Sequence, residues 1–184
     1  EADEDNPEAS GYPIGEADGV GYIEGLEVPN ERHWYGADSH EPDGTPNFNN
    51  EDNSGVMRYI SIRHGGAVVL EANEINGLTC GGVGSGTTLE HIEIVSNADD
   101  GVEFFGGTVD IKYLSVLYCN DDYVDWDQGW VGRGQFIFGV QLQPVSVSIG
   151  GTVNPSYTNG DHGMECDGDD GVRSYLYDPA QDTG

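Results

Sequence analysis

Apolar and polar residues alternate in short stretches from Val56 onward, and no stretch shows the spacing of an amphipathic helix. Residues 57–64, 89–96 and 111–118 read MRYISIRH, LEHIEIVS and IKYLSVLY. Alternation with a period of two is typical of a β-strand that buries one face. Clusters of glycine and aspartate separate the stretches and indicate turns. The pattern therefore predicts an all-β domain.

The apolar stretches also repeat along the chain. Their equivalent positions form two columns, Ile60 with Ile92 and Leu114, and Ile62 with Ile94 and Val116. A second type of segment gives two more columns, Leu78 with Val102, Val124 and Met164, and Cys80 with Phe104, Trp126 and Cys166. Asp99 and Asp121 lie 22 residues apart, which suits one coil of a solenoid. The repeat predicts a parallel β-helix with long Gly/Asp-rich loops.

The remaining chain divides by composition into regions of different character. Residues 1–20 are acidic and small, and we interpret them as an N-terminal arm or linker. Residues 21–55 are rich in Asn, Asp, Gly and Pro, which favours an irregular segment that covers the first coil. Residues 56–184 hold the coils, with an inserted loop or hairpin at about 141–158.

The charge of the chain restricts its partners. It has 34 acidic and 6 basic residues, for a formal net charge of −28. Such a charge repels nucleic acid and anionic membranes, and it favours cations. No apolar run approaches the roughly 20 residues that a membrane helix needs. Because the chain starts with Glu1 and not Met, we interpret it as processed and exported, with an extracellular or cell-surface location after removal of a signal peptide.

Carboxylates recur beside the buried columns. If Val102 and Phe104 point inward, alternation turns Glu103 outward. The acidic residues that stack in this way are Asp99, Asp100, Glu103, Asp121, Asp122, Asp125, Asp161 and Glu165. Carboxylates on neighbouring coils, roughly 4.8 Å apart, repel each other unless a cation bridges them. Oxygen-only ligands suit calcium, so we predict structural calcium here. The alternative is a solvated acidic ladder capped by backbone amides.

Several blocks resemble a family of exported bacterial right-handed parallel β-helix surface proteins. They are NGLTCGGVGSGTT, DDGVEFFGGTVDIKYL and DDYVDWDQGWVGRGQF, and the resemblance covers about residues 52–170. It implies a right-handed β-helix and a surface or extracellular setting, but no established activity. His64 departs from the family, which usually has an aromatic residue there.

The histidines suggest a second metal. His64 ends the first repeat segment, and we expect it to face inward at the open end of the stack. The covering segment would then bring His33, Trp34 or His40 close to it, and imidazoles suit copper. In size, export and acidity the chain is similar to the secreted copper-binding proteins of methane-oxidising bacteria. The alternative is that His64 is a core residue bonded to the covering segment.

Other functions remain open at this point. The aspartate pairs faintly resemble polygalacturonase motifs, and paired carboxylates can serve as general acid and base in a polysaccharide-degrading enzyme. Because the pairs repeat coil after coil, architecture is the simpler explanation. A calcium-stiffened scaffold for adhesion or for binding a surface glycan or protein is a further alternative, with Trp130, Tyr123 and Tyr118 as exposed rings. The odd number of cysteines predicts buried free thiols.

Overall fold

The computed structural model describes residues 20–23, 34–36, 39–40, 46–67, 75–141, 148–149, 152–153 and 163–166. All regular structure in this part of the chain is β-strand. The N-terminal strands are β1 (Val20–Tyr22), β2 (Trp34–Gly36), β3 (Ser39–His40) and β4 (Pro46–Asn47). Across these ranges, no helix has the length and hydropathy to span a membrane.

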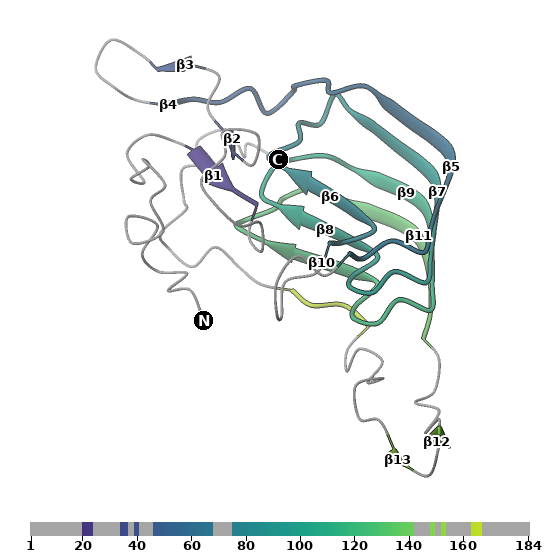
Figure 1. Ribbon diagram of the computed structural model, residues 1–184. Helices are drawn as coiled ribbons and strands as arrows, with labels where there is room; N and C mark the ends of the chain where they lie inside the picture. Colours follow the sequence, from purple (N-terminus) through teal and green to yellow (C-terminus); the bar gives the residue numbers. More distant parts are fainter. Residues whose placement is uncertain are drawn as a thin grey trace, which may run out of the picture.

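Two parallel sheets form the body of the protein (Figure 1). The longer strands, in the order β11-β9-β7-β5, are β5 (Val56–Arg63), β7 (Thr88–Val95), β9 (Ile111–Leu117) and β11 (Gly134–Val140). The shorter strands, in the order β10-β8-β6, are β6 (Leu78–Gly81), β8 (Val102–Phe105) and β10 (Val124–Asp127). Successive strands alternate between the sheets, so the chain winds as a parallel β-helix. The fold class predicted from the sequence is confirmed.

The predicted columns match the strand register. In the long sheet Ile60 pairs with Ile92 and Ile92 with Leu114, and in the short sheet Leu78 pairs with Val102 and Val102 with Val124. An isolated parallel bridge adds Met164 to the second column. The buried members of all the columns form one hydrophobic core, in which Ile94, Val102, Phe104, Ile111, Leu114 and Val116 are fully buried. Stacking of equivalent apolar residues therefore builds the core.

A bend interrupts each long strand, and the sequence pattern did not reveal it. Tyr59, His91, Tyr113 and Phe136 have φ between 54° and 62°, in the left-handed region. Their rings stack in coil order, with centroids 4.6, 4.4 and 4.9 Å apart and interplanar angles of 6–11°. We call these four residues the ring ladder. His91 lies within β7, so the bend falls inside the strand and not at its end.

We expect the stacking in the ring ladder to contribute to stability even though Tyr113 is exposed. Tyr113→Ala should lower the free energy of unfolding by about 1–2 kcal/mol, because it removes two stacked pairs. Urea denaturation measures this. Tyr118→Ala is the matched control, since Tyr118 has a similar φ of 61° and a similar exposure of 41% against 43%, but no stacked ring among the described aromatic residues. Equal losses in both variants would show that the stack contributes nothing.

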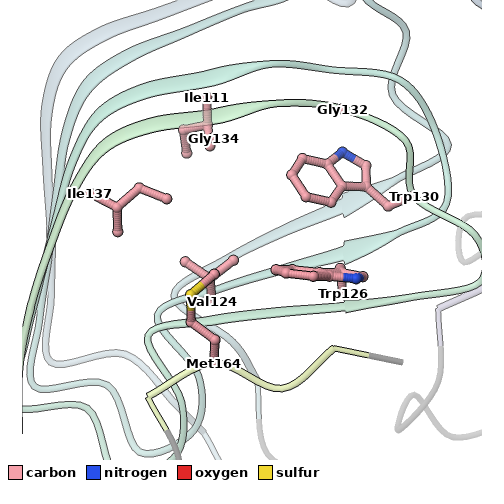
Figure 2. Close-up of a pocket in the computed structure, with 8 residues that line it drawn as sticks. All are labelled: Ile111, Val124, Trp126, Trp130, Gly132, Gly134, Ile137 and Met164. Carbon is pink, nitrogen blue, oxygen red and sulfur yellow. The ribbon is translucent and has the colours of Figure 1, made fainter. Parts of the chain in front are cut away.

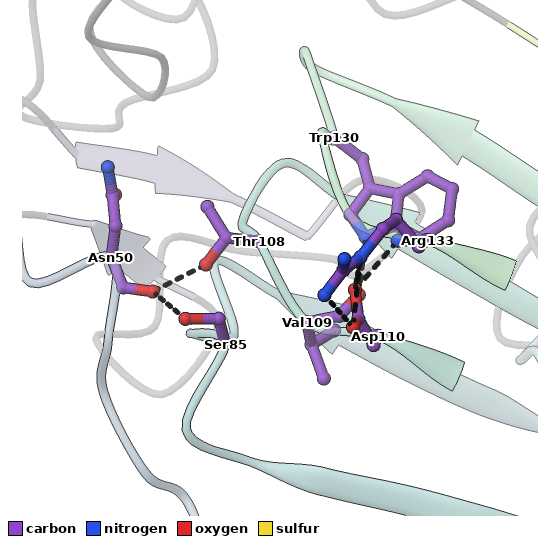
Figure 3. A network of polar contacts seen from close by, with 7 residues as sticks. All are labelled: Asn50, Ser85, Thr108, Val109, Asp110, Trp130 and Arg133. Carbon is purple, nitrogen blue, oxygen red and sulfur yellow. Dashed lines mark hydrogen bonds and ion pairs between the residues drawn. The ribbon is translucent and has the colours of Figure 1, made fainter. Parts of the chain in front are cut away.

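The N-terminal pieces lie against the outside of the coils. Strand β2 pairs antiparallel with β1, and Tyr35 packs on Gly81 and Gly82, where a side chain would have no room. The carbonyl oxygen of Asn50 accepts hydrogen bonds from Ser85 Oγ and Thr108 Oγ1 on two successive coils (Figure 3). Residues 46–55 therefore tie neighbouring coils together from the outside.

Further along, Arg133 binds Asp110 through several hydrogen bonds, with Nη2 lying 2.7 Å from the carboxylate (Figure 3). Of the predicted insertion at 141–158, the structure describes residue 141 and the antiparallel pair β12 (Ser148–Ile149) and β13 (Thr152–Val153). The proposed arm at 1–20 lies outside the described residues except for Val20.

Candidate cation site at the coil corner

The candidate site lies at the corner where each long strand leads into the next short strand. Asp99 and Asp100 precede β8, and Asp121 and Asp122 precede β10 one coil later. The parallel register aligns the two pairs: Gly101 N donates to Asp122 O over 2.9 Å, and Val102 N donates to Tyr123 O. Glycine is required at position 101, since an added Cβ would lie 2.6 Å from the Tyr123 carbonyl oxygen. This close approach holds the carboxylates of adjacent coils together.

Two groups of three carboxylates result, and Asp100 belongs to both. In each group, every residue offers one carboxylate oxygen, and these oxygens lie within 4.8 Å of one another. The first group consists of Asp99, Asp100 and Asp121, and the second of Asp100, Glu103 and Asp125. The first group lies near the surface, whereas the second is largely buried. The sequence therefore predicted five residues that the structure brings together in two overlapping groups.

Burial distinguishes Asp100 and Glu103 from ordinary surface acids. Their exposed fractions are 8% and 6%. Glu103 does lie on the opposite side of β8 from the core residues Val102 and Phe104, as alternation predicts. Outward direction does not expose Glu103, whose carboxylate is buried and accepts a hydrogen bond from Asn76 Nδ2.

The pKa of Asp100 is raised to about 8, chiefly because burial penalises the charged form. A hydrogen bond from Asp122 N to Asp100 Oδ1, 2.8 Å long, opposes the rise, while the charges of Asp99, Asp125 and Asp121 add to it. Without a cation, this carboxyl group therefore holds its proton at neutral pH.

The other predicted calcium ligands have different positions. Asp122 is 1% exposed and lies beside Asp100, but it belongs to neither group. Glu165 is exposed and follows Met164, which forms a bridge with Val124. It also lies outside both groups. Asp161 lies outside the described residues.

Asn76, which donates to Glu103, was not predicted as a residue of the candidate site. Asn76 lies two residues before Leu78, just as Asp100 lies two residues before Val102 and Asp122 two before Val124. Aligning the segments NGL, DGV and DYV would therefore have placed Asn76 in the same column as Asp100 and Asp122.

The predicted copper residues are not brought together among the described side chains. His64 is exposed and has φ of 58°, so the expectation that it faces inward is wrong. Its backbone does align with Ser96 and Tyr118, because all three bond the next coil in the same way and all three are left-handed. A left-handed residue at the strand end breaks the alternation that predicted the inward direction. His33 lies outside the described residues, and the side chains of Trp34 and His40 are not described.

The rings and thiols also differ from expectation. Tyr118 is exposed, but Tyr123 and Trp130 are partly buried against the core, so they do not form the predicted exposed surface. Cys80 and Cys119 are buried, and burial raises the pKa of the Cys80 thiol to about 12. Cys166 is exposed, which corrects the prediction of three buried thiols, although none of the three forms a disulfide.

Comparison with known families fits this architecture. A family model described as a pectate-lyase-like β-helix domain matches residues 44–174. The chain belongs to this family. Comparison with curated proteins and with solved structures gives no match. The pectate-lyase-like β-helix domain spans every coil described above, including both carboxylate groups.

The carboxylate groups of this pectate-lyase-like β-helix domain fit a calcium ion by geometry and by donor type. Two oxygens that each lie roughly 2.4 Å from one calcium ion can be at most about 4.8 Å apart, and calcium takes six to eight oxygen ligands. Each group meets the distance condition with three hard anionic donors. A bound cation would also compensate the desolvated charge of Asp100, which protonation otherwise removes.

Proposed function

We propose that this β-helix domain binds divalent cations, with calcium as the ion, at the corner between neighbouring coils. One observation carries the proposal: the buried Asp100 is shared by two carboxylate groups whose oxygens lie within 4.8 Å. Asp99, Asp100 and Glu103 come from one coil, and Asp121 and Asp125 from the next. A cation held between them replaces repulsion by attraction and stiffens the stack.

The setting that we propose is extracellular or at the cell surface. The net charge of −28 and the β-helix architecture support it, because acidic surfaces suit a calcium-rich environment. Extracellular calcium modules bind with dissociation constants of about 10⁻⁴–10⁻³ M. We expect an affinity in that range, because each described group contributes only three carboxylates and leaves the other positions to water or carbonyl oxygens.

Calcium should raise the free energy of unfolding, and chelation should lower it. At a calcium concentration a hundredfold above the dissociation constant, the gain should be about 2.7 kcal/mol. Denaturation in EGTA and in calcium measures it. Asp121→Asn should weaken binding through the surface group, and Asp125→Asn through the buried group. Asp110→Asn is the control, since Asp110 pairs with Arg133 away from both groups. Identical unfolding curves with and without calcium would refute the cation site.

A polysaccharide-directed role is the second candidate, and the family membership supports it. An enzyme would need an acid and a base that a sugar can reach. Asp100, with its raised pKa, and Asp125 have suitable chemistry, but burial of Asp100 and Glu103 disfavours catalysis there. A calcium-stiffened glycan-binding or adhesion scaffold needs no such access. Calorimetric titration with oligogalacturonate, with and without calcium, tests whether the domain binds an acidic polysaccharide. If neither titration releases heat, this polysaccharide is not a ligand.

Copper acquisition has less support than calcium binding. The copper hypothesis depended on His64 facing inward at the end of the stack, but His64 is exposed. A surface imidazole can still bind copper together with His33 or His40. Elemental analysis of protein purified from copper-replete cells tests this role, and protein without copper would exclude it.

A further inference from the structure

A cavity of about 340 Å³ lies at the last described coil, and Val124 and Trp126 line it from the face of β10 opposite to Asp125. Figure 2 shows its lining side chains around an open centre, with Trp126 and Trp130 on one side and Ile137 on the other. The six-membered rings of both indoles point toward this centre, and their nitrogen atoms lie on the far side. Small-molecule sites commonly measure about 300–1,000 Å³ and have mostly apolar walls. The cavity has the size and walls of such a site.

A glycine stands at one wall of the cavity where the earlier coils have a bulky side chain. Met57, Leu89, Ile111 and Gly134 are paired in successive coils and form one inward column. Leu89 and Ile111 fill this position in their coils and are 3% and 0% exposed. Gly134 leaves it empty in the last coil. Among the described coils, the bulky column is therefore interrupted only beside the cavity.

Contacts with the preceding coil fix one wall of the cavity. Trp130 stacks on Phe104, with centroids 4.4 Å apart and an interplanar angle of 12°. Its Nε1 donates a hydrogen bond to the Val109 carbonyl oxygen over 3.2 Å. One indole face is thus covered by Phe104 and the indole donor is used, while the rest of the ring lines the cavity. A wall held in this way is formed before any ligand arrives, which favours binding.

We propose that this cavity binds a small neutral apolar ligand built on a single aromatic ring. Indole surfaces favour such a ring through offset or edge-to-face contacts, and aliphatic side chains line the opposite wall. An anionic ligand would lose its hydration without a hydrogen-bonding partner, and the net charge of −28 would repel it. The site is independent of calcium and adds a ligand class to the proposed cation binding.

The test uses toluene and benzoate, which share a ring and differ in charge. The indole N–H signals of the full chain are followed by NMR during titration, and Trp126→Phe assigns the Trp126 signal. Toluene should shift the Trp126 or Trp130 signal saturably, and benzoate should not. Absence of a saturable shift with toluene, or an equal response to benzoate, would overturn the proposal.

Gly134→Val provides the structural control. Gly134 does not have a left-handed φ, and an added Cβ would lie 2.9 Å from Ile137 Cδ1, the end of a flexible side chain. The variant should abolish the toluene response without lowering the melting temperature. Ser115→Val adds the same side chain to the outward column of β9 and should leave the response intact.

Gly134→Ala keeps the test valid if the valine variant does not fold, because the smaller side chain should still weaken the toluene response. An unchanged response in the variant that folds would overturn the proposal. Self-association of the wild-type chain that Gly134→Val or Gly134→Ala abolishes would assign the cavity to a second copy, and would overturn the proposal as well.

Discussion

In calcium-free buffer, the free energy of unfolding should fall as the pH rises from about 4 to 8. The pKa of Asp100 is about 8 in the folded chain, against 3.8 for an aspartate in its ordinary, solvated state. Between these values the folded chain holds a proton that the unfolded chain releases, so stability is fully present below the lower pKa and is lost through the higher one. One pKa unit corresponds to about 1.4 kcal/mol, so the total change amounts to several kcal/mol.

Urea denaturation across this pH range measures the effect. Asp100→Asn should be more stable than the wild type at pH 8, and its free energy of unfolding should fall much less between pH 4 and pH 8. Glu93→Gln is the control, because hydrogen bonds from Ser61 and Arg63 lower the pKa of the exposed Glu93, and this variant should keep the fall. Saturating calcium should also reduce the fall, since the bound ion favours the ionised carboxylate. A full fall in Asp100→Asn would refute the role assigned to Asp100.

Phe104→Ala should destabilise the fold by about 3–5 kcal/mol, the usual cost of truncating a buried phenylalanine. Phe104 is fully buried and stacks on Trp130, so its loss leaves a void in the middle coil and frees one face of an indole. Chemical denaturation followed by tryptophan fluorescence measures both changes. Phe138→Ala is the matched control, because Phe138 is 60% exposed and its loss should cost less than about 0.5 kcal/mol. A loss below about 1 kcal/mol in Phe104→Ala would show that the coils can close around the void.

The sequence was sufficient to predict the columns, because every parallel coil repeats the same inward positions. Ile92 pairs with Leu114, and Val102 with Val124, as the aligned segments predicted. The approach of Asp99, Asp100 and Asp121 followed from the same register. Properties that depend only on the repeat were therefore accessible from the pattern.

Properties that depend on local backbone conformation or on a covering segment were not accessible. The left-handed φ of His91 and His64 is uncommon outside glycine, and no residue pattern indicated it. The burial of Glu103 depends on what lies over the outer face of β8, and alternation describes only the direction of the side chain. Trp130 was predicted to be an exposed ring near the aspartate corners, but it stacks on Phe104 and lies partly buried against the core, a contact between coils that no residue pattern indicated.

The fixed register also limits how the length of this protein can change in evolution. Leu89 pairs with Ile111, so removing the 22 residues 89–110 would place Ile111 on Met57 and leave the inward columns continuous. Removing the 23 residues 111–133 would likewise place Gly134 on Leu89, whereas loss of one residue within a strand would turn polar side chains inward along the rest of that strand. The deletion of residues 89–110 would remove Asp99, Asp100 and Glu103 together. Descendants of such a chain would thus gain or lose cation sites in whole units, together with their length.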